Sequence, residues 1–328
     1  LAGPCGARGA AGDAGDAGPS TLDLDALSVE VTSDRPAAWV GKAAAVFREF
    51  RVVVLRGLFS EGVTDAVWRS LRGLHAAWGA KHDPDGLGNR MPGRYDMGAA
   101  YNTQHLTHLP GYVEALDEFG QKGGLQLLQE LGGYMFVGGQ GTLCLANTDN
   151  WQPLHSDYYQ AWHKALESEP EHAPCLDLMF TVHPLTGANG AMRILPGQPL
   201  ADRTYRQDEH PPPRLDKELE SSKQSQLHPL PAGCGILRDI RVWHGGVPNV
   251  SAEDRYIPVL QFYSSRILDL CPDACTRGFG RGVGEDDINQ KLAAEIKEVI
   301  VPFIVRKADD EMPYIEGKRA CWPGTFNY

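Results

Sequence analysis

From residue 134 to residue 265 the sequence consists of short apolar runs separated by glycine, proline and asparagine. Roughly eight of these runs have the length and the bounding turn residues of β-strands. A series of short strands with frequent turn signals predicts a double-stranded β-helix, also called a jelly roll. We therefore expect a mainly β fold with flanking helices, of the cupin-like jelly-roll type.

The residues before this β region favour helices. Apolar side chains recur there at the three- and four-residue spacing of an amphipathic helix. The elements expected are a helix over 35–50, a strand over 51–58, a helix over 60–79, a long loop over 83–104, and a helical stretch over 109–132 that is split near Gly123.

The chain divides into a tail and one domain. Residues 1–25 are expected to form a flexible tail, because its first twenty residues, mostly glycine, alanine, aspartate and proline, bury little apolar surface. Residues 26–328 are expected to form a single domain. Its parts are a helical N-terminal part (26–133), a jelly-roll core (134–265) with a polar surface insertion (200–228), and a C-terminal extension (266–328).

Charge and hydropathy argue against two classes of partner. The formal net charge is −11 and the isoelectric point about 5.5, which disfavours extended binding to a nucleic-acid backbone. No run approaches the roughly 18–20 apolar residues of a membrane span. We expect a small-molecule ligand and no membrane partner.

The cysteines indicate a reducing compartment. Seven cysteines make an odd count with no C-x-x-C pair, so free thiols in the cytoplasm or another reducing intracellular compartment are expected. Zinc binding by Cys271 and Cys275 is an alternative. No signal peptide opens the chain, and a lost targeting segment upstream of Leu1 stays open.

A metal-binding pattern lies inside the β region. His155 and Asp157 are two residues apart, so on a strand both side chains point to the same face while Ser156 points away. His244, from a distant strand, would complete a set of two histidines and one carboxylate. That set leaves positions open on the metal and suits non-haem Fe(II) that activates O2.

Arg255 follows His244 by eleven residues and is the candidate carboxylate clamp. A guanidinium is planar and permanently charged, and can hold a carboxylate through two hydrogen bonds. In a strand Arg255 shares a face with Ile257 and Val259, which predicts that it points into the barrel and needs a partner there. The distal carboxylate of 2-oxoglutarate is the expected partner, with Arg193 as the next candidate clamp.

These motifs resemble the phytanoyl-CoA dioxygenase (PhyH) family of Fe(II)/2-oxoglutarate-dependent oxygenases. The sequence QPLHSD at 152–157 is similar to the first iron-binding strand of that family, and GANGAMRILPG at 187–197 to its segment ending in a Pro-Gly turn. Residues 230–263, with WHGG-x-PN and a later Arg-Tyr, resemble its closing strands. With FREFRVVVLRGLF at 47–59, the resemblance covers roughly residues 40–265.

The resemblance implies a reaction and a set of cofactors. Fe(II) would be held by His155, Asp157 and His244, and 2-oxoglutarate by Arg255, with O2 as the oxidant. The carboxylate at Asp157 implies hydroxylation or a related oxidation of a C–H bond in place of halogenation. The sequence departs from the family pattern at Gly246, where a hydroxyl residue often stands two positions after the distal histidine.

Further residues are candidates for contact with the substrate, and two other functions stay open. The substrate candidates are Arg90, Arg94, Tyr158, Tyr159, Arg277 and Arg281. His183 is the rival metal ligand. The alternative functions are a non-catalytic jelly-roll protein that binds a metal or small acid, and a nucleic-acid-modifying oxygenase, which the acidic charge disfavours.

Overall fold

The structure is a computed structural model that describes most of the chain between residues 22 and 266. The described residues are 22–33, 36–83, 85, 88, 91–97, 106, 109–152, 154–157, 171–190, 192–197 and 225–266. The first 21 residues, most of the expected insertion, nearly all of the C-terminal extension, Cys271 and Cys275 lie outside the described residues.

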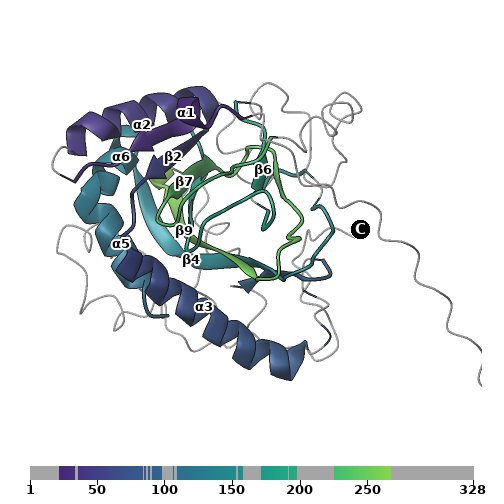
Figure 1. The fold of residues 1–328 in the computed structure, drawn as a ribbon. Helices are drawn as coiled ribbons and strands as arrows, with labels where there is room; N and C mark the ends of the chain where they lie inside the picture. The colour runs from purple at the N-terminus through teal and green to yellow at the C-terminus, as the bar shows by residue number, and fades with distance from the viewer. Residues whose placement is uncertain are drawn as a thin grey trace, which may run out of the picture.

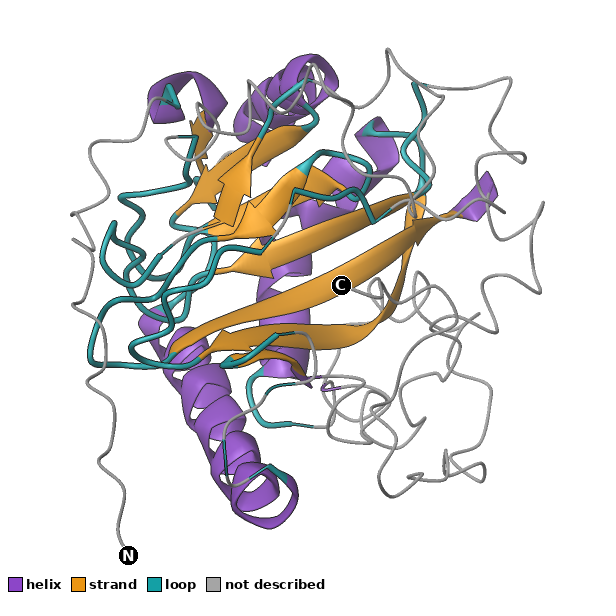
Figure 2. Ribbon diagram, turned by 90° about the vertical axis from the view of Figure 1, so that its right-hand side faces the viewer, coloured by secondary structure: helices purple, strands orange, loops and turns teal. Residues whose placement is uncertain are grey.

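One large sheet forms the centre of the molecule (Figure 2). In spatial order its seven strands are β1 (Ser28–Glu30), β2 (Val52–Arg56), β7 (Gly235–Asp239), β5 (Cys175–Phe180), β9 (Arg255–Ser264), β4 (Tyr134–Cys144) and β3 (Arg94–Asp96). The β1–β2 pair is parallel, and the other pairs are antiparallel. Strands distant in sequence therefore lie side by side, as jelly-roll connections require.

A smaller sheet forms the second wall of the barrel. It contains β6 (Met192–Ile194) and β8 (His244–Gly246). Single β-bridges extend it on both sides, from His155 to β8 and from Gln226 to β6. The two sheets form a double-stranded β-helix with flanking helices, so the predicted fold class is confirmed.

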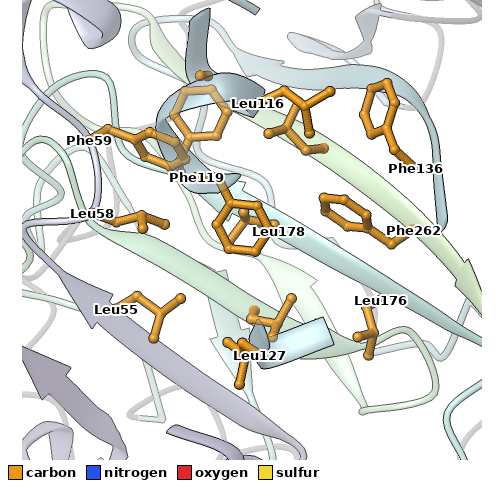
Figure 3. Packing of buried hydrophobic residues seen from close by; sticks show 14 of the residues in the cluster. Leu55, Leu58, Phe59, Leu116, Phe119, Leu127, Phe136, Leu176, Leu178 and Phe262 are labelled. Carbon is orange, nitrogen blue, oxygen red and sulfur yellow. The ribbon is translucent and has the colours of Figure 1, made fainter. Parts of the chain in front are cut away.

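The large sheet separates two apolar clusters. Its strands alternate between them with the two-residue period of a strand: in β2, Val53 and Leu55 join the cluster under the helices, whereas Val52 and Val54 join the cluster inside the barrel. Figure 3 shows the first cluster, in which aromatic and leucine side chains from helices and strands pack together.

Helices cover the outer face of the large sheet (Figure 1). They are α1 (Leu24–Leu27), α2 (Pro36–Phe50), α3 (Glu61–His82), α5 (Tyr112–Phe119) and α6 (Leu125–Glu130), with a π-helical turn η2 (Gly120–Gly124) between the last two. Helix α2 buries Trp39, Val40, Ala43, Ala44 and Phe47, which recur at helical spacing. The predicted split near Gly123 is confirmed, because Gly123 has φ 105° and interrupts the helical geometry.

Three expectations need correction. The predicted loop over 83–104 contains strand β3, which pairs with β4. The N-terminal part is not helical throughout, because β1 and β2 lie in the same large sheet as the jelly-roll strands. Helix α1 begins at Leu24, inside the predicted tail. Strand β2 matches the strand predicted over 51–58, whereas β1 and β3 have only three residues each, so their pairing partners determine them.

The proline in β9 occupies a position where it is tolerated. Strand β5 pairs with β9 from Val259 onward, whereas β4 pairs along the whole of β9. Pro258 therefore lies where β9 has one neighbouring strand, a position at which the missing N–H of proline is tolerated. Among the described helices, none is long and apolar enough to cross a membrane.

Candidate metal centre

Backbone pairing brings the two histidines together. His155 and His244 each donate a backbone N–H to the other residue's carbonyl oxygen, with both N···O distances at 2.9 Å. The backbone N–H of Asp157 donates to the carbonyl of Ile240 at 3.0 Å. Segment 154–157 is thus held beside the end of β7 and the start of β8, although only His155 forms a β-bridge.

The side chains of His155, Asp157 and His244 converge inside the barrel. One ligand atom from each lies within 4.8 Å of the others. Nε2 of His244 is 3.2 Å from Oδ2 of Asp157, and Nε2 of His155 is 3.6 Å from Oδ1. Two imidazole nitrogens and one carboxylate that approach a metal position from the same side form the donor set of a facial triad. These residues therefore fit an Fe(II) ion.

Hydrogen bonding orients the His244 ring. Its Nδ1 lies 2.9 Å from the carbonyl oxygen of Val242 and 3.3 Å from Nη1 of Arg238. A guanidinium cannot accept a proton, so the shorter contact is best described as Nδ1–H donating to Val242. With Nδ1 bound to Val242, Nε2 faces Asp157 at 3.2 Å and is the ring nitrogen that could coordinate a metal once it carries no proton.

A buried arginine that sequence reasoning missed supports the carboxylate ligand. Nη2 of Arg238 donates to Asp157 at 2.8 Å and to Asp177 at 2.6 Å. Gln261 donates to the other oxygen of Asp177 at 3.0 Å. Arg238 and Asp177 are directly paired on β7 and β5 and share the inward face with Met179, so the strand alternation that selected Arg255 could also have found them.

These charges set the protonation of the two carboxylates. Burial alone would raise the pKa of Asp157, but His244 and Arg238 outweigh it and hold the pKa well below its usual range. Burial raises the pKa of Asp177, with Arg238 acting in the opposite direction. Asp157 is therefore ionised at neutral pH and can act as an anionic ligand.

Arg255 points into the barrel as predicted. Ile257 and Val259, in register with it on β9, belong to the interior cluster, and Arg255 is 4% exposed. Its Nη1 donates to the carbonyl of Gly190 and, at 3.3 Å, to that of Val247. Burial and the nearby Arg94 lower the pKa of Arg255 to about 10, so it is a cation at neutral pH.

The other candidate residues that the structure describes are not part of the His-Asp-His cluster. Nε2 of His183 accepts the backbone N–H of Tyr256 at 3.0 Å, and His183 does not join the described ligand cluster. Arg193 pairs with Gly245, the residue next to His244 on β8. Its side chain therefore projects from the face of the small sheet opposite to that of His244. Arg94 is buried. The substrate candidates Arg90, Tyr158, Tyr159, Arg277 and Arg281 lie outside the described residues.

The backbone conformation of Gly190 positions the carbonyl oxygen that accepts a hydrogen bond from Arg255. It has φ 67°, and a Cβ there would lie 2.0 Å from the carbonyl oxygen of Pro248. Gly190→Ala is therefore expected to lower the free energy of unfolding by about 1–3 kcal/mol, measured by denaturant titration. Gly73→Ala is the matched control, because no atom lies within 4 Å of that Cβ on α3, and it should gain up to about 1 kcal/mol. Equal stability of Gly190→Ala and the wild type would contradict this conformational requirement.

A family model matches the part of the chain that contains this candidate site. Residues 145–257, which include the three ligand candidates and Arg255, match the family model described as Phytanoyl-CoA dioxygenase (PhyH). The chain is PhyH-like. With the His-Asp-His cluster, the PhyH-like chain is an Fe(II)/2-oxoglutarate-dependent oxygenase whose cofactor set is Fe(II), 2-oxoglutarate and O2. The predicted resemblance, enzyme class and cofactors are confirmed.

Solved structures also match the PhyH-like chain. EctD from S. alaskensis, solved with 2-oxoglutarate and 5-hydroxyectoine, is 20% identical, with a TM-score of 0.49, over 75% of this chain and 82% of that one. EvdMO1 is 18% identical, with a TM-score of 0.47, over 69% of this chain and 50% of that one. AviO1 from Streptomyces viridochromogenes Tue57 is 14% identical, with a TM-score of 0.46, over 69% and 95%.

Proposed function

We propose that this oxygenase oxidises a C–H bond of a small organic substrate, by hydroxylation or a related reaction. His155, Asp157 and His244 would hold Fe(II), and Arg255 would hold the distal carboxylate of 2-oxoglutarate. The observation that carries this proposal is the convergence of the three ligand atoms within 4.8 Å. When bound, the iron would allow O2 to take two electrons from the substrate and two from 2-oxoglutarate, which would be converted to succinate and CO2.

The residues of the chain supply position and a dry environment. His155 and His244 are fixed by their paired backbones, and Asp157 is oriented by Arg238. The interior apolar cluster, which includes Ile194, Met179 and Val259, borders the site. A water-poor surrounding strengthens the charge interactions of the site and protects a reactive oxidant from solvent.

Succinate release from a metabolite library tests the proposed function. The purified protein is incubated with Fe(II), ascorbate, 2-oxoglutarate and candidate small molecules, and succinate is measured with and without each compound. The proposal expects at least one small molecule to stimulate succinate release in the wild type and not in His155→Ala. Stimulation by nucleic acid and by no small molecule would favour the nucleic-acid-modifying alternative.

Arg255→Ala is expected to weaken 2-oxoglutarate binding. Loss of a buried charged contact should cost about 2–4 kcal/mol, which is about 30- to 1000-fold in affinity. Arg255→Lys keeps the charge but loses the fork, so it should recover part of the affinity. The measurement is anaerobic titration of the Fe(II) protein with 2-oxoglutarate, followed by the metal-to-ligand charge-transfer absorption.

Two controls accompany the Arg255 titration. Fe(II) stoichiometry should be unchanged in Arg255→Ala, because the guanidinium is not a metal ligand. Arg193→Ala should bind 2-oxoglutarate much more tightly than Arg255→Ala, because Arg193 lies on the other face of the small sheet. If Arg255→Ala keeps the wild-type affinity while Arg193→Ala loses it, the clamp is Arg193.

A further inference from the structure

A second arginine lies in the same row of the large sheet as Arg255. On three adjacent strands, Arg94 pairs with Cys144, and Cys144 pairs with Arg255. Directly paired residues of neighbouring strands project to the same face of a sheet. Arg94 therefore points inward, like Arg255, at a Cα separation of about 10 Å across two strand spacings.

The two guanidinium groups meet at one carbonyl. Nη2 of Arg94 donates to the carbonyl oxygen of Val247 at 2.7 Å, and Nη1 of Arg255 donates to the same oxygen at 3.3 Å. Arg94 is 5% exposed and Arg255 is 4% exposed. Two cations buried at one point repel each other, and each lost most of its hydration when the chain folded.

The described partners of Arg94 are neutral oxygens. Its other hydrogen bonds go to Oδ1 and the carbonyl of Asn150, both at 2.7 Å. Arg94 and Arg255 therefore place two buried guanidinium groups beside one carbonyl oxygen. An anion placed there would reduce the repulsion and receive charge-assisted hydrogen bonds.

Gly246 provides the space for the Arg94 guanidinium. Gly246 is two residues after His244 on β8, so a side chain there would point to the same face as the His244 imidazole. A Cβ at Gly246 would lie 2.4 Å from Nη1 of Arg94 and 3.1 Å from Oε1 of Gln152. Nη1 of Arg94 therefore lies beside Gly246 of β8. Gly246 stands between His244 and Val247, whose carbonyl oxygen accepts hydrogen bonds from both arginines.

We propose that Arg94 is a second cation of the 2-oxoglutarate site, where it binds the distal carboxylate together with Arg255. The inference rests on the proposed function, because it takes the metal ligands and Arg255 as the two ends of the co-substrate site. It adds a residue from β3, outside the strands that hold the metal, and it gives Gly246 a role: the absent side chain leaves room for a guanidinium beside the co-substrate.

Co-substrates with and without the distal carboxylate distinguish this role from a purely structural one. 2-Oxopentanoate has the same keto-acid head as 2-oxoglutarate and lacks the distal carboxylate. Arg94→Gln is expected to weaken 2-oxoglutarate binding by about 10- to 100-fold and to change 2-oxopentanoate binding by less than about twofold. The readouts are the anaerobic charge-transfer absorption with Fe(II) and the thermal shift with the Co(II) protein. Equal weakening of both acids, or of neither, would overturn the proposal.

Coupling with Gly246 provides an independent readout. Gly246→Ser should weaken 2-oxoglutarate binding in the wild type, because the new side chain displaces Nη1 of Arg94. In the Arg94→Ala background the same substitution should cause no further loss, so the two effects should not add. Additive losses would overturn the proposed placement. Retained Co(II) binding in every variant shows that the metal site is intact, whereas a wild type that binds Co(II) but neither keto acid would overturn the proposed function as well.

Discussion

Replacing His155 or Asp157 by alanine is expected to remove Fe(II) binding and turnover while the chain still folds. Each substitution deletes one of the three proposed ligands, whose ligand atoms converge within 4.8 Å. Changes to the residues that merely orient metal ligands typically cost 10- to 100-fold in affinity, so loss of a ligand should cost more than about 100-fold. The measurement is Fe(II) bound per chain after anaerobic dialysis, with succinate release measured in parallel.

Two controls test whether the alanine variants still fold and whether His183 is a metal ligand. Side chains of His155 and Asp157 are 11% and 34% exposed, so their truncation should leave the thermal unfolding transition cooperative. His183→Gln keeps an acceptor for the backbone N–H of Tyr256 and should bind one Fe(II) per chain. Wild-type metal content in both alanine variants, or its loss in His183→Gln, would contradict the assignment.

The second large effect is expected at Arg238. Its guanidinium binds both Asp157 and Asp177 inside the barrel. Arg238→Met would leave Asp177, whose side chain is 9% exposed, as a buried carboxylate without its cation. Removing one partner of a buried ion pair costs about 3–5 kcal/mol. We therefore expect the metal-free variant to lose about that much free energy of unfolding in a denaturant titration.

A second substitution identifies the cause of this loss. Arg238→Met/Asp177→Asn removes the stranded charge and keeps an oxygen that can accept the amide of Gln261, so it should recover much of the stability. Arg48→Met is the matched surface control, because Arg48 pairs with Glu130 at 53% and 49% exposure, and it should cost no more than about 1 kcal/mol. A double variant no more stable than Arg238→Met would show that packing, and not charge, determines the loss.

The clustering of the proposed ligands could be predicted in part from the sequence, because part of its geometry is local. The H-x-D spacing places His155 and Asp157 on one face of an extended segment, and the inward register of Arg255 follows from Ile257 and Val259. His244 was proposed as the third ligand because it follows on another strand, although a long stretch of chain separates it from His155. Its pairing with His155 is a product of the jelly-roll connections.

Other parts of the site depend on tertiary pairing that the sequence does not display. Strand β3 has only three residues, Arg94–Asp96, and its surroundings are rich in glycine and asparagine, which predict a loop. Pairing with β4 turns Arg94 inward and buries it. The opposite orientation of Arg193 likewise depends on which residue of β8 it faces. A shift of one residue in either register would reverse these assignments.

The measurement that tests the central claim most directly is the absorption spectrum of the Fe(II)-loaded protein on anaerobic addition of 2-oxoglutarate. Chelation of the keto acid by iron in the His155, Asp157 and His244 site should produce a visible charge-transfer band in the wild type. The band should also form in Arg255→Ala, at a higher 2-oxoglutarate concentration, and it should be absent in Asp157→Ala. A wild-type protein that binds one Fe(II) per chain and shows no band at saturating 2-oxoglutarate would contradict the account.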